Sequence, residues 1–146
     1  MTDMKRVSPQ EALELTNEGW VYVDVRTEQE FAEGHPASAF NVPIAQLPSA
    51  GGPMTPNLDF VSVMESAFGK EAKIVVGCKA GGRSLRAAQA LVGAGFSHVI
   101  DQRAGWDGAR DAFGQMSEPG WSRAGLPAET GPTAGRTYAD VKAKTK

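Results

Sequence analysis

The chain has 146 residues, a single cysteine and a formal net charge of −2. This length fits one domain, the lone cysteine excludes a disulfide-rich secreted module, and the small charge argues against nucleic-acid binding. The sequence shows neither an apolar stretch long enough to span a membrane nor the apolar run of a signal peptide. We therefore expect a cytoplasmic protein with no membrane and no nucleic acid among its partners.

The first quarter of the chain predicts two short helices on either side of a buried strand. Ser8 and Thr27 each precede a glutamate by three residues, the pattern of a capping box, and predict helices directly after them. Residues 20–25 are rich in β-branched and aromatic side chains and predict a buried strand. Residues 37–44 predict a short extended segment.

The middle of the chain alternates in the same way after a loop that is rich in proline and glycine. Apolar periodicity and glycine stops predict four elements. These elements are a helix over 59–68, a strand over 73–77, a helix over 84–92 and a strand over 96–100. Further on, we expect a helix over 107–113, a loop over 114–136 and a last helical turn over 138–144.

Strands that alternate with helices predict an α/β fold with a mostly parallel sheet covered on both faces. Sheets of this kind bind ligands outside the carboxyl ends of their strands, where helix N-termini gather. In this sequence, that rule indicates residues 77–84, where a valine-rich strand ends, a glycine-rich turn follows and a helix begins.

This turn contains the only cysteine of the chain. Cys78 comes first, Gly81 and Gly82 allow the backbone to curl with its N–H groups inward, and Ser84 is a candidate cap for the next helix. Such a turn can hold an anion, and the thiolate is the reactive form of a cysteine. A second interpretation stays open, because a lone cysteine after an apolar strand is also typical of a small buried core residue.

The net charge conceals an uneven distribution. Residues 1–75 carry five Lys/Arg and eleven Asp/Glu, whereas residues 76–146 carry ten and six. Lys79, Arg83 and Arg86 lie close to Cys78 in the basic half. This arrangement favours a small anionic substrate at the cysteine.

Three blocks of sequence resemble the single-domain rhodaneses, a family of sulfurtransferases. The block that resembles the family's active-site loop consists of Cys78, Lys79, Ala80, Gly81, Gly82, Arg83 and Ser84. The block that resembles its N-terminal signature includes Asp24, Arg26, Gly34, His35 and Asn41. Residues 125–127, Gly-Leu-Pro, are similar to the usual ending. The form of the active loop resembles in particular the small plant senescence-associated rhodaneses and their bacterial relatives.

The resemblance implies a rhodanese-like three-layer fold with a central, mostly parallel five-stranded sheet flanked by helices. It also implies one domain over residues 1–129. Within it, residues 107–120 form an insertion relative to the family pattern, and residues 130–146 remain as a C-terminal strap or tail. We assign no function to the insertion or the tail from sequence alone.

The resemblance further implies a covalent mechanism. Cys78 attacks a sulfane-sulfur donor such as thiosulfate, a persulfide forms, and cyanide or a thiol removes the sulfur. Backbone N–H groups of residues 79–84 would stabilise the anion, Arg83 would face the donor, and Lys79 is either a second such contact or a solvated charge. No metal and no organic cofactor is implied, and a protein could serve as sulfur donor or acceptor.

Asp24 and Arg26 lie two residues apart at the end of a predicted strand, where an Asp-x-Arg pair can fix neighbouring loops. We expect structural roles near the site for both, and for His35 a role in holding its loop. His98 lies in a predicted strand and is expected to be structural. Two histidines and one cysteine, far apart, give no zinc-ligand spacing.

Two other functions stay open. A non-catalytic or sulfur-carrier rhodanese module would act through a protein partner. A cysteine-based phosphatase or arsenate reductase would use the same kind of anion-binding turn, but those enzymes have five residues between cysteine and arginine. Here four residues separate Cys78 from Arg83, which gives a smaller turn suited to one sulfur.

Overall fold

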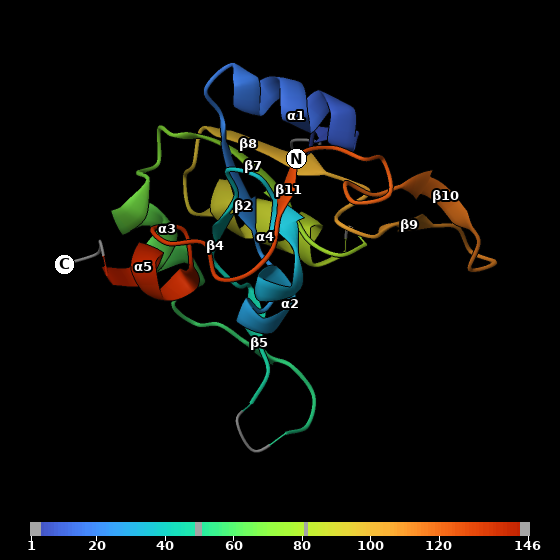
Figure 1. Ribbon diagram of the computed structural model, residues 1–146. Helices are drawn as coiled ribbons and strands as arrows, with labels where there is room; N and C mark the ends of the chain where they lie inside the picture. Colours follow the sequence, from blue (N-terminus) through green and yellow to red (C-terminus); the bar gives the residue numbers. More distant parts are fainter. Residues whose placement is uncertain (1–3, 49–50, 81, 144–146) are drawn as a thin grey trace.

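The computed structural model describes residues 4–48, 51–80 and 82–143, and its centre is a five-stranded sheet (Figure 1). All four strand pairs in this sheet are parallel. In spatial order the strands are β1 (Arg6–Val7), β8 (His98–Gln102), β7 (Lys73–Gly77), β2 (Val21–Asp24) and β4 (Phe40–Asn41). The predicted α/β fold with a central parallel sheet is confirmed.

Helices cover both faces of the sheet, which makes the fold three-layered. The helices within the described residues are α1 (Pro9–Asn17), α2 (Glu28–Glu33), α3 (Phe60–Ala67), α4 (Gly82–Gly93) and α5 (Tyr138–Ala143). Both predicted capping boxes are formed, with Ser8 and Thr27 as the N-caps of α1 and α2. The helices therefore begin where the sequence predicts.

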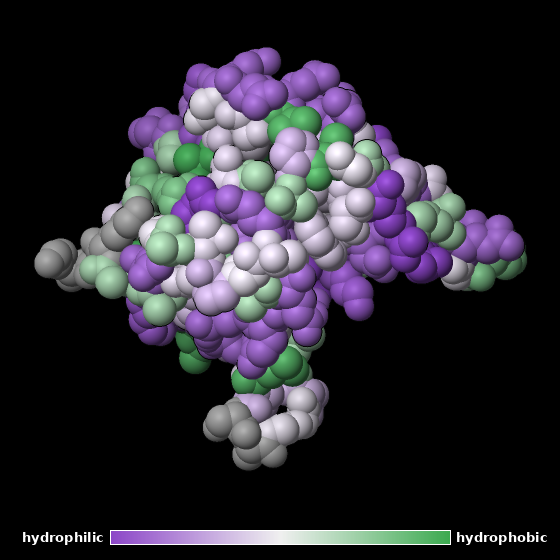
Figure 2. Space-filling model, in the orientation of Figure 1, coloured by the Kyte–Doolittle hydropathy of each residue, from purple (hydrophilic) through white to green (hydrophobic). Residues whose placement is uncertain are grey.

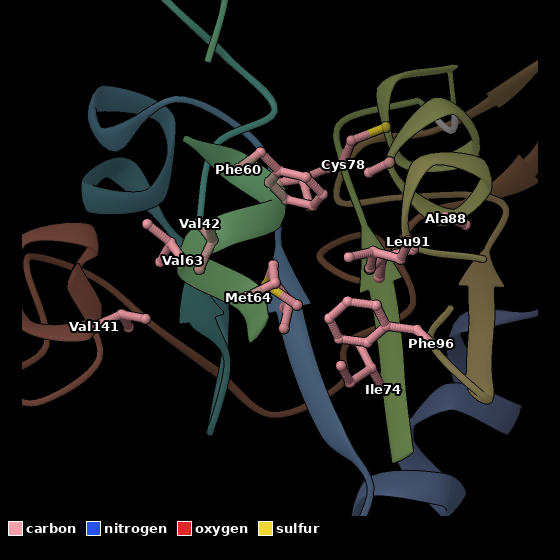
Figure 3. Close-up of a cluster of buried hydrophobic side chains, with 14 of the residues drawn as sticks. Val42, Phe60, Val63, Met64, Ile74, Cys78, Ala88, Leu91, Phe96 and Val141 are labelled. Carbon is pink, nitrogen blue, oxygen red and sulfur yellow. The ribbon is translucent and has the colours of Figure 1, made fainter. Parts of the chain in front are cut away.

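The alternation of side chains along the strands divides the core in two. Val23 of β2 packs on the side of α3, α4 and α5, whereas its neighbour Tyr22 packs on the other side with Trp121. Figure 3 shows the first cluster, in which Phe60 and Met64 of α3 face α4 across the start of the active loop. Cys78 belongs to this cluster, so the candidate nucleophile is anchored in the main core.

Three small antiparallel pairs lie outside the central sheet. They are β3 (His35–Pro36) with β11 (Ala128–Glu129), β5 (Ala45–Gln46) with β6 (Thr55–Pro56), and β9 (Gly108–Arg110) with β10 (Met116–Pro119). The last pair is a hairpin that projects from the body beside the sheet (Figure 1). It contains most of the segment that the sequence marks as an insertion.

The helix expected over residues 107–113 is wrong. The chain there enters β9, turns, and returns as β10. The Asp111 carboxylate accepts hydrogen bonds from the N–H groups of Phe113 and Gln115, and Gly114 has a φ of 79°, so the turn is fixed locally. Arg103 then holds the returning strand through two bonds to Glu118. The loop expected over 114–136 likewise contains β10 and β11.

Smaller corrections concern element ends. The strand expected over 96–100 runs from His98 to Gln102, and the extended segment 37–44 contains only the short β4. The helix expected from Ser84 begins at Gly82, which places Ser84 inside its first turn rather than at its cap. The strand β1 was not predicted, because two residues carry no readable alternation.

The described part of the C-terminal segment packs against the body as a strap. The Asn41 N–H donates to the carbonyl of Arg136, which fixes the strap beside β4. The helix α5 then buries Tyr138 and Val141 in the main core. The last helical turn expected over 138–144 is confirmed as α5, Tyr138–Ala143.

The turn after β8 holds the active loop through backbone hydrogen bonds. The N–H of Trp106 donates to the Cys78 carbonyl at 2.7 Å, and the N–H of Asp107 donates to the Lys79 carbonyl at 2.9 Å. Gly105 has a φ of 67°, and a Cβ there would lie 2.5 Å from both carbonyl oxygens. The two loops can approach this closely only because residue 105 has no side chain.

We expect Gly105→Ala to lower the free energy of unfolding by about 3 kcal/mol, because left-handed strain and a backbone collision add together. Gly114→Ala is the matched control, since Gly114 also has a positive φ but open space around its Cα. It should cost only about 1 kcal/mol. Urea denaturation measures both values, and equal losses would contradict the proposed close approach.

Candidate active site

The candidate nucleophile lies at the carboxyl end of the central strand β7. Cys78 follows Gly77 directly and is 2% exposed. Gly77 has no room for a side chain, because a Cβ there would lie 1.9 Å from the Tyr22 hydroxyl. In Figure 3 the Cys78 sulfur points away from Ile74 and Met64, toward the start of α4. The thiol is therefore packed by the core on one side and faces the active loop on the other.

A serine hydroxyl contacts the sulfur. Cys78 Sγ donates to Ser84 Oγ at 3.5 Å, and Ser84 is fully buried in the first turn of α4. Ser84 also hydrogen-bonds to the side chain of Asp101 in β8. Arg6 Nε in β1 donates to Asp101 Oδ2 at 2.7 Å. A continuous polar chain thus runs from the sulfur across the sheet edge to a half-exposed arginine.

Asp101 is the buried acid in this chain. Its side chain is fully buried, and Oδ1 has no hydrogen-bond partner among the described residues. Burial raises the pKa of Asp101, while its bonds to Ser84 and Arg6 oppose the rise. A buried carboxyl group therefore lies beside Ser84, the residue whose hydroxyl contacts the sulfur.

Arg83 is held by a partner from the other half of the chain. Its guanidinium donates to both carboxylate oxygens of Glu30 in α2, at 2.7 and 3.0 Å, and its side chain is 14% exposed. Burial alone would raise the pKa of Glu30, but hydrogen bonds from Arg83 and Thr27 outweigh burial and lower it to about 2. Glu30 therefore holds the Arg83 guanidinium in one orientation beside the active loop, rather than leaving it free in solvent.

The remaining loop residues differ in exposure. Lys79 and Ala80 are exposed, Gly82 opens α4, and Gly81 lies outside the described residues. Each of the predicted loop residues that the structure describes is placed between the end of β7 and the first turn of α4. The expected curl of inward N–H groups depends on Gly81 and stays a prediction.

Asp24 and Arg26 form a buried pair at the end of β2. Arg26 Nε and Nη2 bond to the Asp24 carboxylate at distances from 2.7 to 3.1 Å, and Nη2 also donates to the Gly34 carbonyl. The guanidinium lies 5.2 Å from the ring centre of Trp106, the residue that holds the active loop. The pair thus connects the loop after β2 to the loop behind Cys78, as a structural role requires.

His35, in β3, is fully buried and joins α2 to the C-terminal strap. Its ring stacks on Phe31 with centroids 3.7 Å apart, Nδ1 contacts the Phe31 carbonyl at 2.7 Å, and Nε2 contacts Thr133 Oγ1 at 2.9 Å. Both ring nitrogens have partners, which fits the expected role in holding its loop. His98, in contrast, is exposed at the start of β8.

The partners of the site residues come from segments that sequence reasoning did not connect. The sequence predicts Glu30 as a capping-box residue, and the structure confirms this. Glu30 also accepts hydrogen bonds from Arg83, which the sequence pattern does not indicate. Asp101 lies in β8, one residue beyond the strand that the sequence predicts, and no local pattern connects it to Cys78. The available signal was topological: β7 and β8 are adjacent parallel strands, so residues near their carboxyl ends meet at one edge.

No cluster of three or more potential metal-ligating side chains occurs within residues 4–48, 51–80 and 82–143. Nor does any helix in the described part of the chain have the length and apolar character to cross a membrane.

The sequence profile described as a Rhodanese-like domain matches residues 8–112, which is most of the chain. The chain belongs to the rhodanese family. This assignment agrees with the resemblance seen in the active loop, and solved structures titled as rhodanese-like domains share the fold.

The chain is similar to several named proteins of plants and bacteria. The chain is 39% identical over 121 residues to thiosulfate sulfurtransferase 16, chloroplastic, of Arabidopsis thaliana, covering 83% of this chain and 89% of that protein. It is 34% identical over 113 residues to the thiosulfate sulfurtransferase GlpE of Ectopseudomonas mendocina, covering 77% and 91%. It is 41% identical over 95 residues to the senescence-associated protein DIN1 of Raphanus sativus, covering 65% of this chain and about half, 51%, of DIN1.

Among solved structures, Rv0390 from M. tuberculosis superposes with a TM-score of 0.72 at 27% identity, covering 89% of this chain and all of that one. The expected likeness to small plant and bacterial rhodaneses is confirmed. Since relatives named for the chloroplast and for the mitochondrion are among the matches, the cytoplasmic location stays a prediction.

We expect Glu30→Gln to destabilise the protein in a pH-dependent way. The pKa of Glu30 in the folded protein, about 2, lies below its ordinary value of 4.5, so the carboxylate form stabilises the fold. The loss of stability on substitution is therefore greatest above pH 4.5 and disappears as the pH falls toward 2. Urea denaturation across this range measures it.

The control for this series is Glu33→Gln in the same helix, because Glu33 is exposed and forms no hydrogen bond or ion pair within the described residues. Its substitution should change stability by less than about 0.5 kcal/mol. A loss for Glu30→Gln that is the same at pH 2.5 and pH 7 would contradict a role for the ionised carboxylate.

Proposed function

We propose that this rhodanese is a sulfurtransferase that moves a sulfane sulfur from an anionic donor to a thiophilic acceptor through a persulfide on Cys78. One observation carries the proposal. A cysteine sulfur sits at the carboxyl end of the central parallel strand, between the packed core and the first turn of α4, beside a fixed arginine fork. Relatives named thiosulfate sulfurtransferase support the same reaction.

In the first step the Cys78 thiolate attacks the outer sulfur of thiosulfate. A new S–S bond forms to Cys78, the S–S bond of thiosulfate breaks, and its electron pair leaves with sulfite. The enzyme then carries Cys–S–S⁻. Positive charge from Arg83, and backbone N–H groups of the active loop, would stabilise the anionic sulfur as it forms.

In the second step an acceptor attacks the outer sulfur of the persulfide. With cyanide, the product is thiocyanate and the Cys78 thiolate is regenerated; with a thiol, the product is a new persulfide. Because the chain has one cysteine, no internal thiol can take the sulfur. The acceptor must therefore be an external molecule or a partner protein. No metal or organic cofactor takes part in this scheme.

A sulfur-carrier role through a protein partner is the second candidate, and it shares the first step. A cysteine-based phosphatase is disfavoured by the short turn, in which four residues separate Cys78 and Arg83.

Mass spectrometry of the intact protein after incubation with thiosulfate tests the proposal. We expect one added sulfur, about 32 Da, which is absent in Cys78→Ser and is removed by cyanide with release of thiocyanate. Transfer to protein thiols without thiocyanate formation would favour the carrier role. Hydrolysis of an aryl phosphate, together with no sulfur adduct from any donor, would overturn the proposal.

Ser84 and Asp101 act as positioning residues in this scheme. A serine hydroxyl has one hydrogen to donate, and both the carboxylate of Asp101 and the ionised sulfur of Cys78 can accept it. While Ser84 donates to Asp101, its oxygen can only accept from the thiol. The thiolate gains the serine hydrogen bond only when the hydroxyl turns away from Asp101.

We therefore expect Asp101→Asn to speed persulfide formation. The amide N–H can donate to Ser84 Oγ, so the serine hydrogen is released toward the attacking sulfur. At pH 7, kcat/KM for thiosulfate should rise by roughly tenfold, since a hydrogen bond to a charged group contributes about 1.5 kcal/mol or more. Stopped-flow measurement of persulfide formation gives this rate.

Ser84→Ala is the companion variant. It removes the hydroxyl through which Asp101 acts, so Asp101→Asn should have a smaller effect on kcat/KM in the Ser84→Ala background than in the unmodified protein. An Asp101→Asn rate of persulfide formation that is unchanged or lower would contradict this role of Ser84 and Asp101. A thermal melt of each variant separates this effect from loss of the fold.

A further inference from the structure

A recess of about 490 Å³ lies between the β9–β10 hairpin and the active loop. Its lining residues come from β1, the active loop, the turn after β8 and both strands of the hairpin. They include Arg6, Ala80, Arg103, Arg110, Ser117 and Glu118. In Figure 2 the surface where the hairpin leaves the body, at the right of the view, is mostly hydrophilic. The family profile ends at residue 112, inside this hairpin, so β10 lies outside the part of the chain that the profile matches.

The hairpin is joined to the active loop through its backbone. The N–H groups of Asp107 and Gly108, where the hairpin begins, both donate to the Lys79 carbonyl, at 2.9 and 3.4 Å. Gly108 is the first residue of β9, and Lys79 directly follows Cys78. These bonds fix the base of the hairpin, and with it the recess, beside the segment that contains the candidate nucleophile.

The lining of the recess carries more positive than negative charge, because it contains three arginines and one glutamate. Arg103 pairs with Glu118, and its side chain is still 40% exposed. Arg6 pairs with the buried Asp101, and its side chain is 37% exposed. Arg110 donates to a carbonyl of its own hairpin at 3.1 Å and forms no ion pair among the described residues. Arg110 therefore offers a positive charge that no carboxylate in the described part of the chain holds.

These properties fit a sulfur acceptor better than thiosulfate. In thiosulfate the negative charge lies on the reacting sulfur and on the group bonded to it, so a cation that binds this charge must stand in the active loop. Arg110 stands on the hairpin instead, where it is placed to bind a charge several bonds away from the reacting atom. A recess of this size holds an organic molecule. An acceptor thiol with a carboxylate supplies a charge at such a distance from its sulfur.

We propose that the recess binds the carboxylate of a small acceptor thiol, of the class HS–R–COO⁻, while its sulfur reaches the persulfide on Cys78. This inference rests on the proposed function. Arg110 binds the carboxylate through charge-assisted hydrogen bonds, and Arg6 and Arg103 add to the positive field. The acceptor thiolate attacks the outer sulfur of the persulfide, the S–S bond to Cys78 breaks, and its electron pair stays on the Cys78 thiolate. Charge balances, because one thiolate and one persulfide anion give one persulfide anion and one thiolate.

The test compares two acceptors of equal length that differ in charge, 3-mercaptopropionate and 3-mercaptopropionamide. Cys78 is first loaded with thiosulfate and the excess donor is removed. The second-order rate constant for loss of the added sulfur is then measured with each acceptor by quenched-flow mass spectrometry of the intact protein. Each variant is compared with the unmodified protein for the same acceptor, so the intrinsic reactivity of each thiol cancels.

Two variants change the charge of the recess in opposite directions. Arg110→Gln should lower the rate constant for 3-mercaptopropionate about fivefold, the effect of one exposed ion pair, and change that for the amide by less than about twofold. Ser117→Lys adds a positive charge at an exposed lining position and should raise the rate constant for the carboxylate alone, by about twofold to threefold.

Two charge-matched controls lie outside the recess. Lys73→Gln removes one positive charge at the amino end of β7, which is the opposite end of the strand from Cys78. Ala112→Lys adds one at an exposed position in the turn of the hairpin, which is not among the residues that line the recess. Both should leave the two rate constants within about twofold of the unmodified protein, because solvent and salt screen charges at these positions.

The outcomes separate this inference from the proposed function. If thiosulfate loads Cys78 but Arg110→Gln slows the carboxylate and the amide equally, or slows neither, the recess proposal is overturned and the sulfurtransferase stands. Ser117→Lys gives an independent result if Arg110→Gln disturbs the hairpin, and a rate constant for the carboxylate that does not rise would also overturn the proposal. If no donor adds sulfur to Cys78, the proposed function itself fails, and the recess proposal fails with it.

Discussion

The geometry around Cys78 depends on one constraint. The active loop packs against the turn after β8 and against Tyr22 of β2, and residues 105 and 77 at these two contacts have no room for a side chain. The turn after β8 approaches the carbonyls of Cys78 and Lys79 because residue 105 is glycine. Gln102 clamps that turn: its Oε1 accepts from the N–H groups of Ala104 and Gly105, and its Nε2 donates to the Gly105 carbonyl. Its other bond reaches the Tyr22 hydroxyl, which fills the space beside Gly77. Backbone hydrogen bonds from the turn after β8 thus fix the position of the cysteine.

Charge pairs between distant segments fix part of the site. Glu30 of the acidic first half holds Arg83 of the basic second half, whereas Asp101 and Arg6 pair in the opposite sense. Among the basic residues near Cys78 in sequence, Arg83 is therefore committed to orientation, while Arg86 forms no hydrogen bond or ion pair within the described residues. Most of the other ion pairs among the described residues join residues of one half, so pairing between the halves accounts for only part of the uneven charge.

Local signals were sufficient for some of this structure and insufficient for the rest. The capping boxes at Ser8 and Thr27 are complete within four residues, so the helices that they begin could be predicted. The β9–β10 hairpin could not, because Arg103 and Glu118, which hold it against the body, are far apart in sequence. The same division applies to the site. The Cys78 loop is one contiguous motif, whereas the role of Asp101 depends on the register of two parallel strands.

The burial of Cys78 bears on why the proposed reaction has two steps. A thiol that is 2% exposed and packed in the main core is a poor target for a bulky acceptor, yet it is held rigidly for attack on a small terminal sulfur. Once the persulfide has formed, the reactive atom lies one bond further from the core, while the cysteine keeps its packing. The donor must therefore present its sulfur to the buried thiolate, whereas the acceptor meets a sulfur that already projects from the active loop. The two substrates of the proposed reaction therefore face different steric demands at the same cysteine.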